Sequence, residues 1–214
     1  SLGFSPFLIL ATDSLILILL NTILQKYGGK SQGDMFITCA TIAQSYLLLI
    51  TSSMIGISGG TQAILSYNYG ARRADRVKDA ERNILGVMLI FTTIMFLLSR
   101  LVPRYFVLLF TSDPQYISFS VWAIHTYTLM IIPLSFQYVF VDGLTALDRP
   151  KTGLALSVTR KSLFVLSAAI LPVFFDAKAA FFAEPVADGV CSVLSTVVFL
   201  LLINRHLQKR CQTV

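Results

Sequence analysis

The sequence predicts an all-α, polytopic membrane protein, built as a bundle of six transmembrane helices. Hydrophobic residues make up 55% of the chain and charged residues only 13%, whereas a soluble domain carries about 25% charged residues. Six apolar runs are each long enough to cross the roughly 30 Å hydrocarbon layer of a bilayer as a helix. The basic residues that give the net charge of +6 gather at the ends of these runs. That distribution argues for a membrane protein and against a nucleic-acid-binding one.

The predicted spans occupy the whole chain, residues 1–214, as one six-helix lobe. They cover residues of about 4–25, 35–58, 84–102, 117–141, 153–175 and 181–203. The charged segment of about 70–82 is predicted to be a loop between the second and third spans, with Gly70 at its turn. Pro133 should kink the fourth span, because proline removes a backbone donor. The apolar run 103–111 is too short to span and is predicted to be an interfacial helix.

Small and polar residues form a stripe along the second span, at spacings of three, four or seven residues. The stripe consists of Thr38, Thr41, Ser45, Ser52, Gly56 and Gly59. Because small residues let helix backbones approach closely in lipid, this face is predicted to pack on another helix. The third span has few polar side chains and is predicted to face lipid.

The distribution of Lys and Arg predicts the orientation of the chain. With six spans, twelve of these residues fall on one side of the membrane and five on the other. The positive-inside rule places the richer side in the cytoplasm. The segment 70–82 and both chain ends are therefore predicted to be cytoplasmic. The basic residues of that segment are also placed to contact membrane lipid headgroups.

Charged and amide side chains inside the first span are the sharpest signal of function. Asp13 lies about ten residues into that span, and Asn21 follows eight residues later. An Asp near the centre of a membrane helix costs roughly 2.5–3.5 kcal/mol on insertion scales. One interpretation is that Asp13 binds a proton or Na⁺, or attracts a cationic substrate, with Asn21 beside it. The alternative is that Asp13 stays neutral and hydrogen-bonds a neighbouring helix.

Further polar residues are candidates for lining a cavity within the bundle. Glu184 and Asp188 are four residues apart and share one face of the sixth span. They either line an outward-facing cavity or form a solvated helix start that the helix dipole favours. Arg160 either snorkels to the cytoplasmic surface or points inward as a counter-charge. The remaining cavity-lining candidates are Gln44, Gln62 and Gln137.

The sequence does not indicate an enzyme, a cofactor or a metal site. Asp13 has no second Asp at helix-centre depth, as an intramembrane aspartyl protease would need. Residues 56–60 (GISGG) read as GxSxG, but Ser58 lies at the cytoplasmic end of its span and His125 in the outer half of another. The three cysteines are scattered, with no spacing typical of a metal site.

Residues 60–71 (GTQAILSYNYGA) resemble a loop motif that follows the eighth helix of MATE (multidrug and toxic compound extrusion) transporters of the bacterial drug-efflux branch. In this motif the matching positions are Gln62, Tyr67, Asn68 and Gly70. Supporting matches are Asn21 with residues 27–29, and residues 110–113, 142–144 and 185–188. The resemblance extends over essentially the whole chain and agrees with the six predicted spans.

The resemblance implies a function that the residues alone do not. MATE transporters have two six-helix lobes and export organic cations in exchange for Na⁺ or H⁺. This chain would be the C-terminal lobe of such a multidrug efflux antiporter, in the bacterial cytoplasmic membrane, with the N-terminal lobe of the same protein as its partner. Asp13 would be the seventh-helix carboxylate of the cation site, but the family's tenth-helix acid is unmatched: Gln137 lies there, and no acid precedes Asp142. The alternatives are a flippase of lipid-linked sugars, or a non-transporting membrane scaffold or half-transporter fragment.

Overall fold

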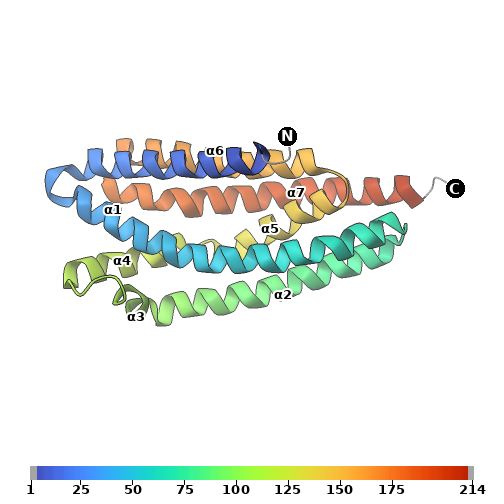
Figure 1. Ribbon diagram of the computed structural model, residues 1–214, viewed down its shortest axis with the longest axis horizontal. Helices are drawn as coiled ribbons and strands as arrows, with labels where there is room; N and C mark the ends of the chain where they lie inside the picture. The colour runs from blue at the N-terminus through green and yellow to red at the C-terminus, as the bar shows by residue number, and fades with distance from the viewer. Residues whose placement is uncertain (1–3, 212–214) are drawn as a thin grey trace.

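The computed structural model describes the backbone of residues 4–211 and the side chains of residues 15–29 and 32–203. Within these residues the protein is helical and contains no strand. Its elements are α1 (Phe4–Gly70), α2 (Ala74–Leu101), α3 (Pro103–Val107), α4 (Pro114–Tyr127), α5 (Ile131–Ala146), α6 (Pro150–Phe174), the 3₁₀ helix η1 (Ala177–Phe182) and α7 (Ala183–Cys211). Figure 1 shows an elongated bundle in which the long helices run side by side. The predicted fold class is confirmed.

The first two predicted spans form the two arms of α1, which bends back on itself at Gly29. This residue has φ 65° and ψ −170°, outside the helical region, and glycine adopts positive φ without steric cost. The two arms also approach each other closely at the bend. A Cβ on Gly28 would lie 2.8 Å from the Cα of Gly33, which is too close for a larger residue. In Figure 1 the first arm lies beside α6 and the second beside α2.

The segment predicted as a loop at 70–82 is mostly helix, which corrects that prediction. The second arm of α1 continues to Gly70, and α2 already begins at Ala74. The charged residues form the first turns of α2. The helical spacing of buried residues already begins there, on the inner side of α2, with Val77, Glu81 and Ile84. The residue with positive φ in the turn is Arg72, at 58°, so Gly70 ends the helix without supplying the turn conformation.

The fourth predicted span is divided into α4 and α5, which meet at an angle of 47°. The break comes at residues 128–130, before Pro133, and not at the proline as predicted. Pro133 is the third residue of α5, and the first residues of a helix have no intrahelical acceptor for their N–H groups. A proline at this point therefore costs little, and the bend does not depend on it.

The number of apolar helices is roughly consistent with the six predicted spans. Four helices among the described residues are long and apolar enough to cross a membrane, and the bent pair α4–α5 makes a fifth. The shorter apolar segment Leu15–Gly29 belongs to the first arm of α1 and accounts for the sixth. The predicted interfacial helix is α3, which has five residues.

The small-residue stripe of α1 is largely exposed among the described residues, so its packing on another helix stays a prediction. Thr38, Thr41, Ser52, Gly56 and Gly59 are all exposed, and a Cβ added to either glycine would meet no atom within 4 Å. The opposite side of the same arm supplies the core instead. Its fully buried residues there are Cys39, Ala43, Ile50 and Met54.

Candidate functional site

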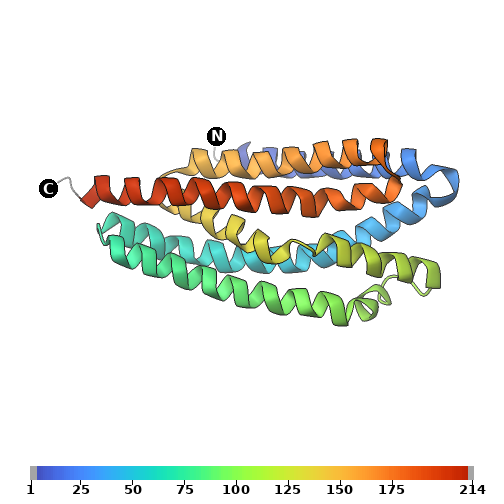
Figure 2. The same cartoon turned by 180° about the vertical axis from the view of Figure 1, so that it is seen from behind.

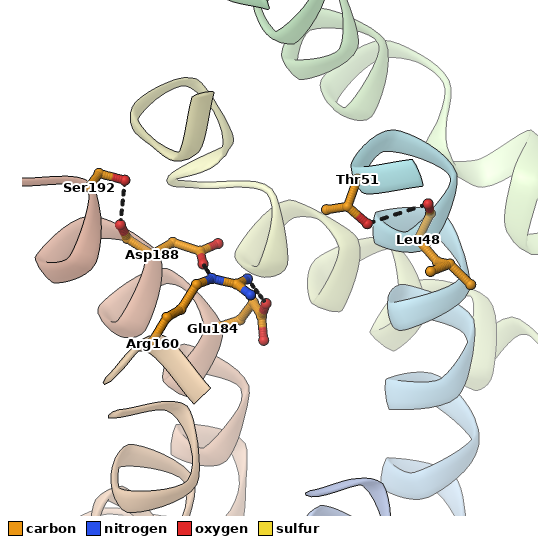
Figure 3. A network of polar contacts seen from close by, with 6 residues as sticks. All are labelled: Leu48, Thr51, Arg160, Glu184, Asp188 and Ser192. Carbon is orange, nitrogen blue, oxygen red and sulfur yellow. Dashed lines mark hydrogen bonds and ion pairs between the residues drawn. The ribbon is translucent and has the colours of Figure 1, made fainter. Parts of the chain in front are cut away.

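An arginine and two carboxylates from neighbouring helices form an ion-pair network inside the bundle. Arg160 of α6 donates from Nε to Oδ1 of Asp188 and from Nη2 to Oε1 of Glu184, each over 2.7 Å. Figure 3 shows the guanidinium between the two carboxylates, both of which α7 supplies. Charge-assisted hydrogen bonds are roughly twice as strong as neutral ones, so the network ties α6 firmly to α7.

The network lies near the middle of the membrane-spanning segments. Arg160 is ten residues after Pro150, where the 25-residue α6 begins. Glu184 and Asp188 are seven and eleven residues after Ala177, where an apolar segment of 27 residues begins. The pair therefore lies deeper in its span than predicted, because η1 adds helical length before α7. Charges at this depth are expensive unless they are paired or face a cavity.

Of the two orientations predicted for Arg160, the structure shows the inward one, in which the side chain is a counter-charge to Glu184 and Asp188. Arg160 does not snorkel to the cytoplasmic surface. The side chains of Arg160 and Glu184 are 21% and 14% exposed, whereas Asp188 is only 1% exposed. The network holds one positive and two negative formal charges. Its more exposed members, Arg160 and Glu184, are the ones able to meet a polar ligand.

Two adjoining cavities reach this network from the side of α1. The larger, of about 460 Å³, lies between both arms of α1 and helices α5, α6 and α7. Its polar lining comes from Gln44, Thr51, Tyr138, Arg160, Lys161 and Glu184. Figure 3 shows Thr51 on α1 facing the network from the opposite side. The smaller cavity, of about 210 Å³, shares Tyr138, Arg160 and Lys161 and adds Gln137, Asp142 and Ser157.

Two buried oxygens near the network have no hydrogen-bond partner among the described residues. They are Oδ2 of Asp188 and Oε1 of Gln137, and the two residues are 0% and 4% exposed. Buried polar atoms are normally paired, because an unmade hydrogen bond costs about 1–3 kcal/mol. Gln137 lines the smaller cavity together with Arg160, which places this unpaired oxygen close to the ion-pair network.

A second polar cluster, which the sequence did not indicate, joins α1, α2 and α5 at the end of the bundle predicted to be cytoplasmic. Ser58 and Gln62 lie within hydrogen-bonding reach of Asp142, and Glu81 is its electrostatic neighbour. Glu81 is 5% exposed and its carboxyl group lies against Gly143. A signal for this burial was present, since Glu81 continues the helical spacing of buried residues on α2.

The other predicted site residues do not belong to the ion-pair network, and some of them line the cavities beside it. The side chain of Asp13 lies outside the described residues. Asn21 is half-buried on the first arm of α1. Gln44 lines the larger cavity with Arg160 and Glu184, whereas Gln62 meets Asp142, which lines the smaller one.

Apart from Gln62, the residues of the loop motif lie at the end of α1 and do not line the two cavities. Tyr67 is 72% exposed. Asn68 donates from Nδ2 to the carbonyl of Ile64 over 2.9 Å, and its own carbonyl accepts from the backbone N–H of Arg73. Together with Gly70, which ends the helix, these residues shape the turn into α2 and do not reach the cavities.

Comparison with known proteins supports the architecture. A protein described as a FAD transporter from Shewanella oneidensis is 26% identical over 136 residues, which are 64% of this chain and 29% of that protein. The solved structure of an inward-facing multidrug resistance MATE family transporter has a TM-score of 0.82 at 15% identity, covering 95% of this chain and 46% of its own. Its outward-facing counterpart has a TM-score of 0.83 at 15% identity, covering 93% and 44%.

The chain thus spans less than half the length of the relatives it matches. The fold it shares with them is that of one half of a MATE transporter. The MatE family matches residues 10–171, which include both arms of α1 and nearly all of α6. The protein is therefore a member of the MatE family of membrane transporters.

Proposed function

We propose that this chain forms one lobe of an exporter that moves organic solutes across the cytoplasmic membrane in exchange for Na⁺ or H⁺. The observation that carries the proposal is the Arg160–Glu184–Asp188 network beside a cavity in the middle of the spans. A scaffold has no need for three charges at this depth, where each is expensive. A transporter needs polar groups there, because substrate and ion sites lie near the bilayer midplane.

The exposed face of α1 supports the presence of a second lobe. Its small residues suit close helix packing, and a Cβ on Gly56 or Gly59 would meet no atom of the described residues within 4 Å. We propose that the N-terminal lobe of the same protein covers this face, with the cavities between the two lobes. The lobe fold matches inward-facing and outward-facing relatives equally well. This agrees with two lobes that rock as rigid bodies.

The charge of the cavities favours an organic cation or a neutral aromatic solute. Arg160 and Lys161 line them together with Asp142 and Glu184, and Asp188 adds a negative charge to the network. This balance lacks the positive excess that a flippase would need for the phosphates of a lipid-linked sugar. The name of the Shewanella relative makes FAD a second candidate substrate.

An export assay with imposed gradients tests the proposal. The natural full-length protein would be reconstituted into vesicles loaded with a fluorescent organic cation or with FAD, under a Na⁺ or pH gradient. Gradient-dependent loss of one solute would support the proposal and identify both substrate and coupling ion. Loss of neither, from vesicles that contain folded protein, would reject it.

The role proposed for Asp13 is tested by Asp13→Asn, which keeps the size of the side chain and removes its charge. If Asp13 couples export to the ion, this variant should lose the gradient dependence. The matched control is Asp34→Asn, at an exposed position of the same helix, which should leave export unchanged. Full coupled export by Asp13→Asn would exclude Asp13 from the mechanism.

A further inference from the structure

We propose that a groove between α2 and α7 binds an anionic phospholipid, with one acyl chain in the groove and the phosphate held by Lys78 and Arg82. The groove has a volume of about 300 Å³ and lies away from the cavities described above. Figure 2 shows α5 passing between α7 and α2. α5 forms the floor of the groove, and the other two helices form its walls.

The floor and walls of the groove are apolar and well packed. Phe140 of α5 and Phe199 of α7 are stacked, with ring centroids 4.4 Å apart and planes 11° from parallel. Both rings are at least 94% buried. Leu85 of α2 and Leu200 of α7 also line the groove, and Leu200 is 58% exposed. The apolar surface is open from outside, so the methylene groups of a lipid can cover it.

Two basic residues mark one end of the groove. Lys78 and Arg82 are one helical turn apart on α2 and therefore share a face, and both line the groove. Both are exposed, and neither forms an ion pair with another described residue. At about 1.5 Å per residue, the lining of α2 from Lys78 to Leu85 extends roughly 10 Å from the headgroup end into the apolar part.

Glu81 lies between these basic residues in sequence and also lines the groove, but the residue is only 5% exposed and its carboxyl group is packed against α5. Its oxygens lie against the backbone of Gly143 on α5, and Oε1 is buried. Lys78 and Arg82 consequently present a positive end to the groove. The bias of Lys and Arg predicts that this end is cytoplasmic, and the cytoplasmic leaflet carries the anionic lipids that attract basic residues.

Lipid binding to the purified full-length protein tests this inference independently of transport. Binding of phosphatidylglycerol would be measured by native mass spectrometry and compared with that of phosphatidylcholine bearing the same acyl chains. The double substitution Lys78→Gln with Arg82→Gln should weaken phosphatidylglycerol binding about thirtyfold, the effect of two basic residues near a membrane surface. The Leu200→Trp substitution should obstruct the groove and weaken binding while both basic residues remain.

The matched control is Arg73→Gln with Arg76→Gln, which removes the same charge from the same helix start outside the groove lining. This control should bind phosphatidylglycerol as the unaltered protein does. If the control weakens binding as much as the groove pair, the interaction is diffuse surface attraction and the site is rejected. Equal binding of the two lipids by the unaltered protein would also overturn the inference.

Discussion

Replacing Arg160 by methionine should strongly destabilise the lobe. The substitution keeps an unbranched side chain of similar length but removes the only cation that contacts Glu184 and Asp188 among the described residues. Asp188 would remain buried with its charge uncompensated. Breaking a buried ion pair by removing one partner costs about 3–5 kcal/mol, and this is the loss of unfolding free energy that we expect.

A second substitution separates the charge effect from the loss of packing. In the Arg160→Met background, Asp188→Asn removes the buried charge while keeping the shape of the side chain. The double variant should therefore be more stable than Arg160→Met alone, with a coupling energy of about 0.5–3 kcal/mol. If Arg160 mattered only as packing, the second substitution would not recover stability.

Unfolding by a denaturing detergent, followed by circular dichroism on the full-length protein, measures these differences. Lys151→Met is the matched control, because it removes a cation from an exposed position of the same helix and should change stability by less than about 0.5 kcal/mol. The reasoning fails if Arg160→Met unfolds at the same detergent fraction as the unaltered protein. It also fails if the control is destabilised to the same extent.

Two further substitutions test local features of the fold. Gly143→Ala would place a Cβ 3.0 Å from Cδ of Glu81 and should cost about 1–3 kcal/mol by overpacking. Adding Glu81→Ala should restore part of this loss in the same unfolding assay, and no restoration would show that the contact is not the cause. Asp113 accepts hydrogen bonds from the backbone N–H groups of Gln115 and Tyr116, so Asp113→Ala should cost about 0.5–2 kcal/mol. Faster amide exchange in the first turn of α4 would reveal the lost cap, whereas Asp113→Asn, which keeps an acceptor, should stay close to the unaltered protein.

The features predicted well from the sequence are those set by local pattern. Hydropathy and the flanking basic residues gave the spans, because helices in a bilayer must satisfy their own backbone and be about 20 residues long. The pairing of Glu184 with Asp188 on one face followed from helical spacing alone. The two residues lie deeper than predicted, because η1 extends the span and its apolar residues were interpreted partly as a loop.

The features that the sequence could not give depend on which helices meet. Arg160 is 24 residues from Glu184, and only the packing of α6 on α7 brings the two together. The exposed stripe of α1 was predicted to be packed, and the surface proposed to cover it does not belong to this chain. The burial of Glu81 was missed for another reason. Its charged neighbours suggested a loop, although its spacing from Val77 and Ile84 is that of a buried helical position.

The location of the ion-pair network limits how it can take part in transport. Arg160, Glu184 and Asp188 all belong to α6 and α7, within one lobe. If the two lobes rock as rigid bodies, as proposed, their movement does not separate these three residues. What changes is access to the cavity beside Arg160 and Glu184, from one side of the membrane and then from the other. Any change in the network itself must then come from what binds there: a proton or ion that neutralises a carboxylate, or a substrate that competes for Arg160 or Glu184.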